Sequence, residues 1–406
     1  MVVLSPSSSI LPDGVIVDYW SLLPEDVWFE ILRRLPTDLV FKLWVVSKVW
    51  HSTLSNPDFK TRWIKHNSLP ETILFYNLED SITSKNTVIK HIIPNRSIRR
   101  GPCVAWAASL DNSLTFIRKH DVFSFKFLSQ VHQRLYLLAS TNGLILCSSG
   151  YNSPWMNFFV CNPLTKRYVK LPEPSYLFPD HDYLFGFVSD SYSSVYYKVV
   201  LIEELTLPSN GFVLYIFCSD LQEWETHCVS CPDLITMKKS LSSNVVNSCG
   251  VLYWIEGEGD RIVACDLNRD MRCSLIRLPK RDNNQKDEYQ CLGESEGSIM
   301  YSRRQGGELE VWLLEGSSSV WHLVHKIETQ HMLFPCHGAE RYGSTVDFRH
   351  TAFNPVDRNI MILTCSYGIF TYSIATRKLK QLKLVGYTHR DGYRNPIMLA
   401  PWVTAL

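Results

Sequence analysis

The sequence lacks a pronounced excess of charge of either sign. Across 406 residues, Lys and Arg number 41 and Asp and Glu number 40, which leaves a formal net charge of +1. A chain with balanced charge produces no field that would draw it to a phosphate backbone or to anionic lipid. We therefore expect no nucleic-acid partner and no membrane partner.

Long apolar runs and a basic N-terminal segment are also missing. No stretch approaches the ~18 to 20 consecutive apolar residues that are needed to span a bilayer, and the first basic residue is Arg33. A secretory signal begins with a positive region and a transit peptide is rich in Arg. These absences predict a protein of the cytoplasm, the nucleus or both.

The cysteines form neither a disulfide framework nor a zinc pattern. The chain has 12 of them, between Cys103 and Cys365, mostly inside apolar runs where a reduced thiol acts as a small hydrophobe. Cys228 and Cys231 stand close together, but a structural zinc site needs four ligands and no second close pair supplies them. We interpret these two as thiols in a loop that ends at Pro232, and we expect no metal and no cofactor.

The sequence does contain ample apolar material. With 45% hydrophobic and 20% charged residues, the chain can bury a large core, which excludes wholesale disorder. At roughly 150 residues per domain, the length predicts two or three domains or one long-period repeat. Residues 1–19 carry a Ser-rich run and no apolar period, so we expect a flexible leader there.

Residues 20–67 have the features of short helices. Pro24 suits a first helical position, where its missing N–H costs nothing, and Pro36 ends that segment. An apolar face follows a four-residue spacing: Val27, Ile31 and Leu35, widened by Leu32. A second segment has apolar residues at a helical period: Leu39, Leu43, Val46, Trp50 and Leu54. So small a block cannot cover all this apolar surface itself, so we expect a partner or the following domain to cover it.

From residue 71 onward the pattern changes to short β-branched and aromatic runs, separated by Gly, Asn, Asp, Ser and Pro. No long amphipathic helix interrupts them, which predicts an all-β domain over residues 71–406. The runs are 73–76, 135–139, 144–147, 158–161, 196–202, 212–218, 251–255, 262–265, 299–301, 309–314, 360–365 and 369–372.

These runs recur in a larger unit of two strands, a polar turn and an extended closing segment. The polar ends of the second strands lie about 46 to 58 residues apart, at Asn162, Asp220, Asp266, Glu315 and Ser373. Periods near 40 to 50 residues that are built from strands are typical of β-propeller blades. About 335 residues at this period predict six or seven blades.

Four motifs at characteristic spacing make residues 20–67 resemble an F-box: Leu23-Pro24-Glu25-Asp26, Glu30-Ile31-Leu32-x-Arg34-Leu35-Pro36, Val46-Ser47-Lys48-x-Trp50 and Asn56-Pro57-x-Phe59. The β region resembles the F-box-associated or kelch-like propeller of a large plant F-box group. Its most recognisable phrase is Val160-Cys161-Asn162-Pro163-Leu164-Thr165-Lys166, followed by Leu171-Pro172. The resemblance implies an α+β multidomain chain, with a leader at 1–19, a helical F-box at 20–67 and an all-β propeller at 71–406.

The resemblance also implies a function, that of a non-catalytic substrate-recognition subunit of an SCF-type cullin-RING E3 ubiquitin ligase. The F-box would bind a Skp-family adaptor, which links it to a cullin and a RING subunit, and the propeller would hold an unknown target protein for ubiquitination. Such a receptor acts by proximity and needs no catalytic residue of its own. The residues that the F-box match assigns to adaptor binding are Leu23, Pro24, Val27, Ile31, Leu35, Pro36, Leu39 and Trp50.

Two alternative hypotheses remain open at this point. The first is a scaffold or carbohydrate-binding propeller, rich in Trp and Tyr, with an F-box that does not engage a cullin. The second and less favoured is an enzyme, because propellers also host oxidases and hydrolases at their central opening. Separately, Gly293 to Gly297 match the G-x-S-x-G elbow of hydrolases, which would make Ser295 a nucleophile. That elbow requires a helix after the serine, whereas residues 298–301 continue as a strand, so we interpret Ser295 as part of a blade turn.

Loops rather than strands are expected to choose the substrate. Strand residues are committed to hydrogen-bond ladders and to packing between blades, whereas loops can vary without unfolding the core. The connections that are long and irregular enough to serve are 172–182, 279–290 and 330–341.

Overall fold

The computed structural model divides into two compact units, residues 1–68 and residues 69–406. The structure describes residues 24–32, 34–35, 43, 48–56, 59 and 62 of the first unit, and residues 72–76, 106–108, 128, 135–149, 156–162, 166–174, 183–189, 196–205, 207–237, 245–257, 260–280, 289–316, 319–332, 348–355, 357–365, 368–382 and 394–399 of the second. Among these residues, no helix is long and apolar enough to cross a membrane.

The first unit contains two short described helices, α1 (Glu25–Leu32) and α3 (Lys48–Ser55). The chain enters α1 directly after Pro24, whose carbonyl oxygen accepts the backbone N–H groups of Val27 at 3.0 Å and Trp28 at 3.2 Å. A proline suits this place because the first N–H groups of a helix have no partner within it. The predicted start at Pro24 therefore agrees with the observed helix.

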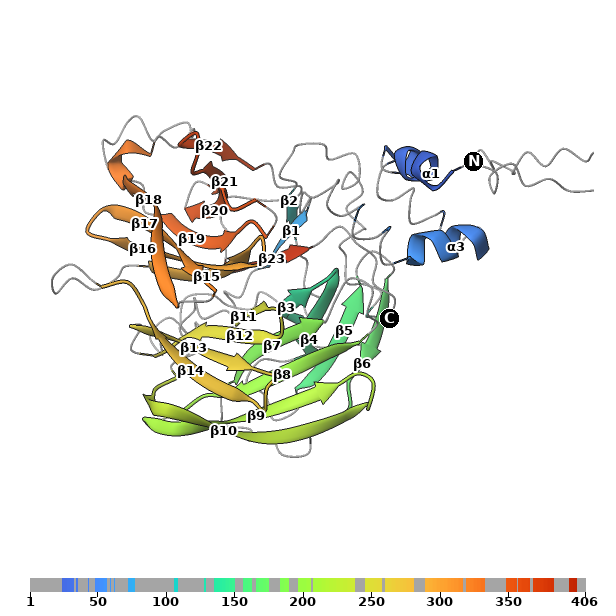
Figure 1. Ribbon diagram of the computed structural model, residues 1–406, viewed down its shortest axis with the longest axis horizontal. Coiled ribbons are helices and arrows are strands. Elements are labelled where there is room, and N and C mark those ends of the chain that lie inside the picture. The colour runs from blue at the N-terminus through green and yellow to red at the C-terminus, as the bar shows by residue number, and fades with distance from the viewer. Residues whose placement is uncertain are drawn as a thin grey trace, which may run out of the picture. The chain divides into compact units, whose positions relative to one another are not determined.

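The described part of the second unit consists of antiparallel sheets (Figure 1) and a short 3-10 helix, η4 (Thr329–His331). Five sheets have four strands each, and we call them blades 1 to 5. Blade 1 comprises β3 (Leu135–Thr141), β4 (Leu144–Ser149), β5 (Asn157–Asn162) and β6 (Arg167–Lys170); blade 2 comprises β7 (Tyr183–Ser189), β8 (Tyr197–Glu203), β9 (Ser209–Cys218) and β10 (Glu223–Ile235); blade 3 comprises β11 (Val246–Ser248), β12 (Val251–Ile255), β13 (Arg261–Asp266) and β14 (Arg272–Arg277); blade 4 comprises β15 (Tyr289–Ser295), β16 (Ser298–Gln305), β17 (Glu308–Glu315) and β18 (Val320–Glu328); blade 5 comprises β19 (Phe348–Phe353), β20 (Ile360–Cys365), β21 (Gly368–Ser373) and β22 (Lys378–Gln381).

A further sheet of three strands joins the two ends of this unit. Its order is β2-β1-β23, made of β1 (Thr72–Tyr76), β2 (Trp106–Ala108) and β23 (Arg394–Leu399). The first strand of each blade contacts the first strand of the next, from β3 through β7, β11 and β15 to β19, and β23 contacts both β19 and β3. The ring of first strands is therefore closed by a sheet that combines strands from before and after the five blades.

The predicted count of six or seven blades is corrected by this topology. Among the residues that the structure describes there are five four-stranded blades, and the three-stranded sheet takes the remaining place in the ring. The count is too high because it treats residues 71–134 as blade-forming. The described strands of that stretch, β1 and β2, belong to the three-stranded sheet instead.

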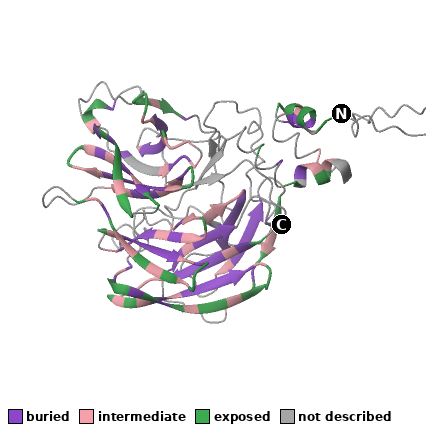
Figure 2. Ribbon diagram, in the orientation of Figure 1, coloured by how far each residue is buried: buried purple, intermediate pink, exposed green. Residues whose placement is uncertain are grey.

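The predicted strand runs correspond mostly to the second and third strands of the blades. All six residues of β4 are buried, and the middle four residues of β13 are buried as well. A strand that is covered on both faces has a continuous apolar sequence, which is the pattern that sequence analysis detects. Figure 2 shows burial concentrated in these strands and exposure along fourth strands such as β10, where polar and apolar residues mix.

Tight two-residue turns join the first and second strands in several blades. Both turn residues have a positive φ angle: 45° and 80° at Asn142-Gly143, 52° and 81° at Cys249-Gly250, and 49° and 76° at Glu296-Gly297. This pair of angles matches the type I′ turn, whose twist suits the flanking strands. A residue with positive φ also precedes every fourth strand: Lys166, Gln222, Met271, Ser319 and Arg377.

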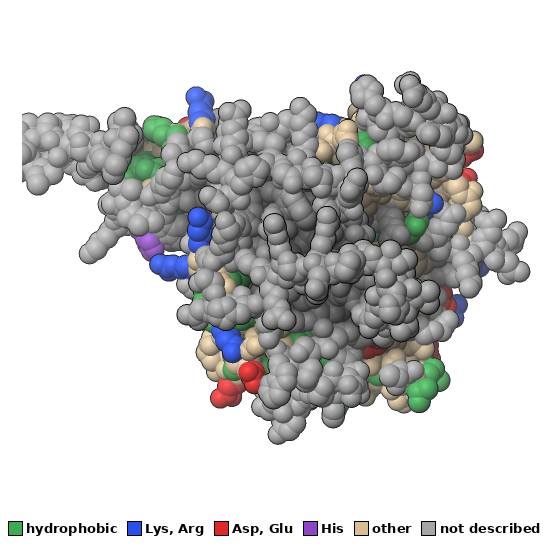
Figure 3. All heavy atoms as spheres, turned by 180° about the vertical axis from the view of Figure 1, so that it is seen from behind, with side chains coloured by type: hydrophobic (Ala, Val, Ile, Leu, Met, Phe, Trp, Pro, Cys, Tyr) green, Lys and Arg blue, Asp and Glu red, His purple; other side chains and the backbone are tan. Residues whose placement is uncertain are grey.

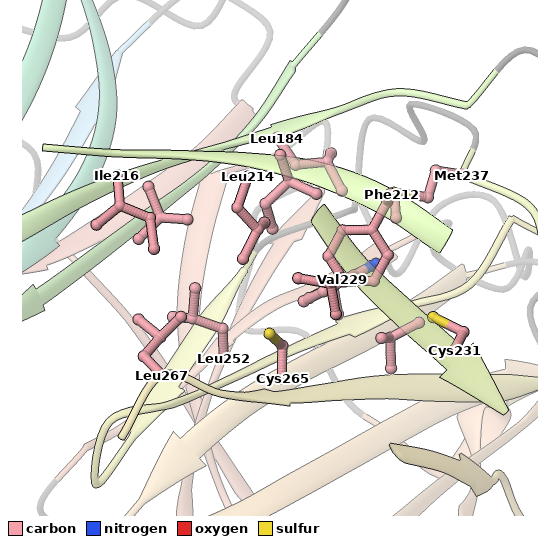
Figure 4. Packing of buried hydrophobic residues seen from close by; sticks show 14 of the residues in the cluster. Leu184, Phe212, Leu214, Ile216, Val229, Cys231, Met237, Leu252, Cys265 and Leu267 are labelled. Carbon is pink, nitrogen blue, oxygen red and sulfur yellow. The ribbon is translucent and has the colours of Figure 1, made fainter. Parts of the chain in front are cut away.

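The core lies between neighbouring blades rather than inside a single blade. In Figure 4, Leu184, Phe212 and Val229 of blade 2 face Leu252 and Cys265 of blade 3, all in one buried cluster. Each large apolar side chain buried in this way contributes about 1.5 to 3 kcal/mol. Three further clusters fill the junctions of blades 1 and 2, 3 and 4, and 4 and 5.

Substituting alanine for each of two glycines, in separate variants, tests the turn geometry. Gly297 has φ +76° and Gly316 does not lie in the left-handed region, yet a Cβ at either position would meet no heavy atom within 4 Å. Gly297→Ala should destabilise the protein by about 1 kcal/mol, because an L-residue is strained at positive φ. Gly316→Ala should be neutral or slightly stabilising. Thermal unfolding followed by the strand signal in circular dichroism compares the two; equal effects would contradict the turn assignment.

His325 predicts a pH dependence of stability. Its Nε2 lies 2.9 Å from the hydroxyl oxygen of Tyr372 in the next blade, and burial, assisted by the charge of Arg377, lowers the pKa of His325 below its ordinary 6.5. In the pH window just below 6.5 the unfolded chain therefore binds more protons than the folded protein, so stability falls as pH falls through that window. His325→Gln should reduce this slope and cost about 1 kcal/mol at pH 8 through the lost contact. Denaturant unfolding between pH 8 and pH 5 measures both, and an unchanged slope would refute the role of His325.

Candidate functional site

The inner face of α1 is made of large apolar side chains. Trp28, Phe29 and Leu32 are buried. The Trp28 ring meets the ring of Trp50 on α3 edge-on, with centroids 4.2 Å apart and planes at 76°. Phe29 meets Phe59 in the same way at 5.6 Å. These edge-to-face contacts fix α1 against α3 and against the segment that follows it.

The segment after α3 is held back against α1 by polar contacts. The Asn56 side-chain oxygen accepts the backbone N–H of Phe59 at 3.5 Å. The Arg62 guanidinium lies 4.4 Å from the centre of the Phe29 ring and 3.2 Å from a carboxylate oxygen of Asp26. The motif residues Asp26, Asn56 and Phe59 therefore take part in contacts within this unit.

The outer face of α1 combines apolar and charged side chains at the surface. Val27 is 40% exposed, and Ile31, one turn later, is half-buried. Beside them, Glu30 and Arg34 form an exposed ion pair at 3.4 Å. An exposed apolar side chain with a charged rim is a common feature of a surface that binds another protein.

The predicted adaptor-binding residues divide into those that the structure describes and those that it does not. Pro24 and Val27 are exposed, and Ile31, Leu35 and Trp50 are half-buried. Leu23, Pro36 and Leu39 lie outside the described residues. The predicted four-residue series follows the outer edge of the helix, so it missed the residues of the inner face, Trp28 and Phe29. The sequence feature that indicates this inner face is the aromatic character of Trp28 and Phe29, together with the aromatic motif residue Phe59.

On the second unit, exposed apolar side chains gather on β18. Val320 is 49% exposed, Leu323 53% and Val324 42%. The register of β18 with β17 shifts at this point, so that Val324 is an extra residue on β18. Among the described strands, β18 pairs with β17 alone and forms the outer edge of blade 4.

Carboxylates lie toward both ends of the β17–β18 pair, with Glu315 opposite Val320 and Glu308 opposite Glu328. β17 and β18 together carry Glu308, Glu310, Glu315 and Glu328 against one lysine, Lys326. The Lys326 ammonium lies 2.7 Å from Glu308 and 3.0 Å from Glu310, which leaves the two strands with a net negative charge. On the face that Figure 3 shows, described side chains of both charge signs reach the surface.

Most residues of the three predicted recognition loops (172–182, 279–290 and 330–341) lie outside the described residues. Their described ends are anchored to the blades. The indole N–H of Trp224 donates to the Pro172 carbonyl oxygen at 2.8 Å. The buried guanidinium of Arg303 donates to the carbonyl oxygens of Pro279 at 3.0 Å and Lys280 at 3.1 Å. These loops therefore begin from fixed points on the blades.

The strand and turn geometry around Ser295 does not make a nucleophile elbow. Ser295 ends β15, and the turn at Glu296-Gly297 leads into β16 rather than into a helix. The buried Ser295 hydroxyl donates to the Asn354 carbonyl oxygen of blade 5 at 2.5 Å. Its role in this arrangement is to connect two blades, as the sequence analysis predicts for a blade turn.

The interpretation of Cys228 and Cys231 as loop thiols is wrong. Both residues lie on β10, where Cys228 is exposed and Cys231 is buried. The sequence around them is polar enough to suggest a loop, but it belongs to the long outer strand of blade 2. Among the described residues, no group of three or more His, Cys, Asp or Glu side chains is placed to hold a metal ion.

Comparison with known families agrees with both units. Residues 20–62 match the F-box domain, and residues 106–382 match the family described as "F-box protein At3g26010-like, beta-propeller". The chain belongs to this family of F-box proteins. The predicted organisation, a small N-terminal F-box followed by an all-β propeller, is therefore confirmed.

The relatives of this F-box protein include several from Arabidopsis thaliana. "F-box protein At5g03970" is 25% identical over 373 residues, which cover 89% of this chain and 83% of that protein. "F-box protein At3g26010" is 24% identical over 324 residues, 75% of this chain and 68% of that protein. Among solved structures, TolB from Acinetobacter baumannii has a TM-score of 0.43 at 10% identity, covering 86% of this chain and 72% of TolB.

Proposed function

We propose that this F-box protein is the substrate-recognition subunit of an SCF-type cullin-RING E3 ubiquitin ligase. The F-box unit binds a Skp-family adaptor, the adaptor links the chain to a cullin and a RING subunit, and the propeller holds a target protein for ubiquitination. The observation that carries this proposal is the exposed apolar face of α1 within an F-box match, in the same chain as a propeller.

The outer face of α1 supports the adaptor-binding role. Val27 leaves apolar surface exposed on the outer side of α1, whereas Trp28 and Phe29 on the inner side are buried. Because an interface gains most of its affinity from a few apolar residues that lose their water, one well-covered valine contributes measurably to binding. The charged pair Glu30–Arg34 beside it belongs to the rim, where single contacts contribute little.

The proposed mechanism requires no bond-making group from this chain. Holding the target and the adaptor on one polypeptide raises the effective concentration of target lysines near an activated ubiquitin. The work is proposed to take place in the cytoplasm, the nucleus or both. Cys231, Cys265 and Cys273 are thiols rather than disulfides, which suits a reducing compartment.

We further propose that the edge of β18 contributes to target binding. Its apolar residues Leu323 and Val324 are exposed, on a pair of strands that carries four glutamates and one lysine. An extended target segment can add to such an edge through backbone hydrogen bonds, with its side chains contacting the strand. The negative charge of β17 and β18 favours a segment that carries both apolar and basic side chains.

Substituting Val27 tests adaptor binding. Val27→Asp should weaken binding of the full chain to a Skp-family adaptor on the order of 10- to 100-fold, because it places a charge within a desolvated apolar contact. Val27 is surface-exposed, so the first unit should keep its fold. Glu30→Ala, on the same helix, is the matched control and should change binding less than about threefold. Calorimetric titration gives both affinities; full affinity in Val27→Asp would refute the proposed interface.

The same preparation separates this function from a scaffold role. Co-purification of a cullin with the wild-type chain, and its loss with Val27→Asp, is the expected result for a ligase subunit. Adaptor binding without any cullin would favour the scaffold hypothesis instead.

Two charge substitutions test the β18 edge. Leu323→Lys with Val324→Lys should reduce target capture on the order of tenfold or more while adaptor binding stays the same, because they replace apolar contacts and repel a basic segment. Proximity labelling with the proteasome blocked measures capture. Leu207→Lys, at an apolar residue of blade 2 that is 75% exposed, is the control. If the double variant Leu323→Lys/Val324→Lys captures the same targets as the wild type, recognition lies away from β18. The predicted loops are then the next candidates.

A further inference from the structure

Two thiols meet where the outer strands of blades 2 and 3 come together. The Sγ atom of Cys231 on β10 lies 3.0 Å from the Sγ atom of Cys273 on β14, and these two strands contact each other. Cys231 is buried and Cys273 is half-buried. Figure 4 shows Cys231 at the edge of the apolar cluster between the two blades. The close sequence neighbour Cys228 is exposed on the same strand.

The surroundings make the two thiols unequal. The hydrogen bond between the two thiols, in which either sulfur can be the donor, lowers the pKa of Cys231. The charge of Arg261 adds to this lowering, and burial and the charge of Glu256 oppose it. The same hydrogen bond, with burial, raises the pKa of Cys273. Arg261 is itself fixed by Glu256 at 2.6 Å. A thiol with a lowered pKa in contact with a thiol with a raised pKa is the arrangement of a reactive cysteine and its resolving partner.

A third cysteine lies nearby and has a different character. Cys265 stands opposite Cys273 in the register of β13 and β14. Burial raises the pKa of Cys265 to about 12, so its thiol stays protonated and unreactive. The short sulfur–sulfur distance and the unequal thiols single out Cys231 and Cys273 as the pair.

We propose that Cys231 and Cys273 are a peroxide-responsive dithiol, whose oxidation forms a reversible disulfide between blades 2 and 3. The Cys231 thiolate attacks one oxygen of hydrogen peroxide, the O–O bond breaks, and the departing hydroxide takes up a proton to become water. Cys231 is then a sulfenic acid. The Cys273 sulfur attacks the Cys231 sulfur, the S–S bond forms and the S–O bond breaks. The released hydroxide and the Cys273 proton form a second water, so two thiols are oxidised and one peroxide is reduced.

The proposed disulfide joins residues that are 42 positions apart and belong to different blades. A cross-link of this kind stabilises a protein mainly by restricting the unfolded chain. In a reducing compartment the pair rests as two thiols, and a small thiol restores them after oxidation. This modification site is independent of the proposed ligase function.

Trypsin makes the test selective. Cleavage after Lys and Arg places Cys273 alone in the peptide 273–277 and Cys265 alone in 262–269, whereas Cys218, Cys228 and Cys231 share the peptide 199–238. The full chain is reduced, treated with hydrogen peroxide, alkylated and digested. The expected product joins 273–277 to 199–238 and disappears after treatment with dithiothreitol. The oxidised protein should also melt several degrees higher than the reduced protein.

Variants identify the sulfur atoms. Cys228→Ser is the matched control and should keep the cross-linked peptide, whereas Cys231→Ser and Cys273→Ser should each abolish it together with the rise in Tm. Cys273 is half-buried, so Cys273→Ser keeps the test valid if Cys231→Ser fails to fold. A cross-link that persists in Cys231→Ser, a link from 273–277 to 262–269, or oxidation of single cysteines without any cross-link would each overturn the proposal.

Discussion

Apolar packing between neighbouring blades is the interaction on which the second unit depends. Each described cluster takes its side chains from two successive blades, so no blade has a complete core of its own. Polar contacts follow the same junctions, as the bond of Ser295 to blade 5 and that of His325 to Tyr372 illustrate. A blade therefore gains stability from both of its neighbours, which is the energetic logic of a repeat protein closed into a ring. The surface of such a ring can carry binding residues without being needed for the fold.

The two units divide the proposed work according to how each is stabilised. The helical unit buries the aromatic residues Trp28, Phe29 and Phe59 in its own interior and leaves Val27 outside. The propeller commits its second and third strands to the core and presents its fourth strands to solvent. The helical unit has a partly exposed apolar face, whereas the propeller buries its own core. This division suits a protein that is proposed to connect an adaptor with a target. The family assignment from the comparisons agrees with this division.

The sequence predicted the elements that are buried on two sides and missed those that are not. β4 and β13 are covered on both faces and have continuous apolar runs, whereas β18 alternates irregularly and β11 has only three residues, so neither could be recognised by periodicity. For the F-box unit, the four-residue series through Val27 and Ile31 located a helix face, but distinguishing its inner and outer sides required the positions of Trp50 and Phe59. The meeting of Cys231 with Cys273 depends on how two blades pack, which no local pattern encodes.

The closure of the ring by β23 has a consequence for the biosynthesis of the protein. β23 follows all five blades along the chain and contacts both β19 and β3, so the ring can close only after residues 394–399 have left the ribosome. Until then, blades 1 and 5 each lack the neighbouring strand that the closed ring provides, and an incompletely packed chain exposes surface that attracts other chains. A nascent or prematurely terminated chain would thus be a ready client for chaperones. The protein that is proposed to select others for degradation is itself open to quality control until its last strand is in place.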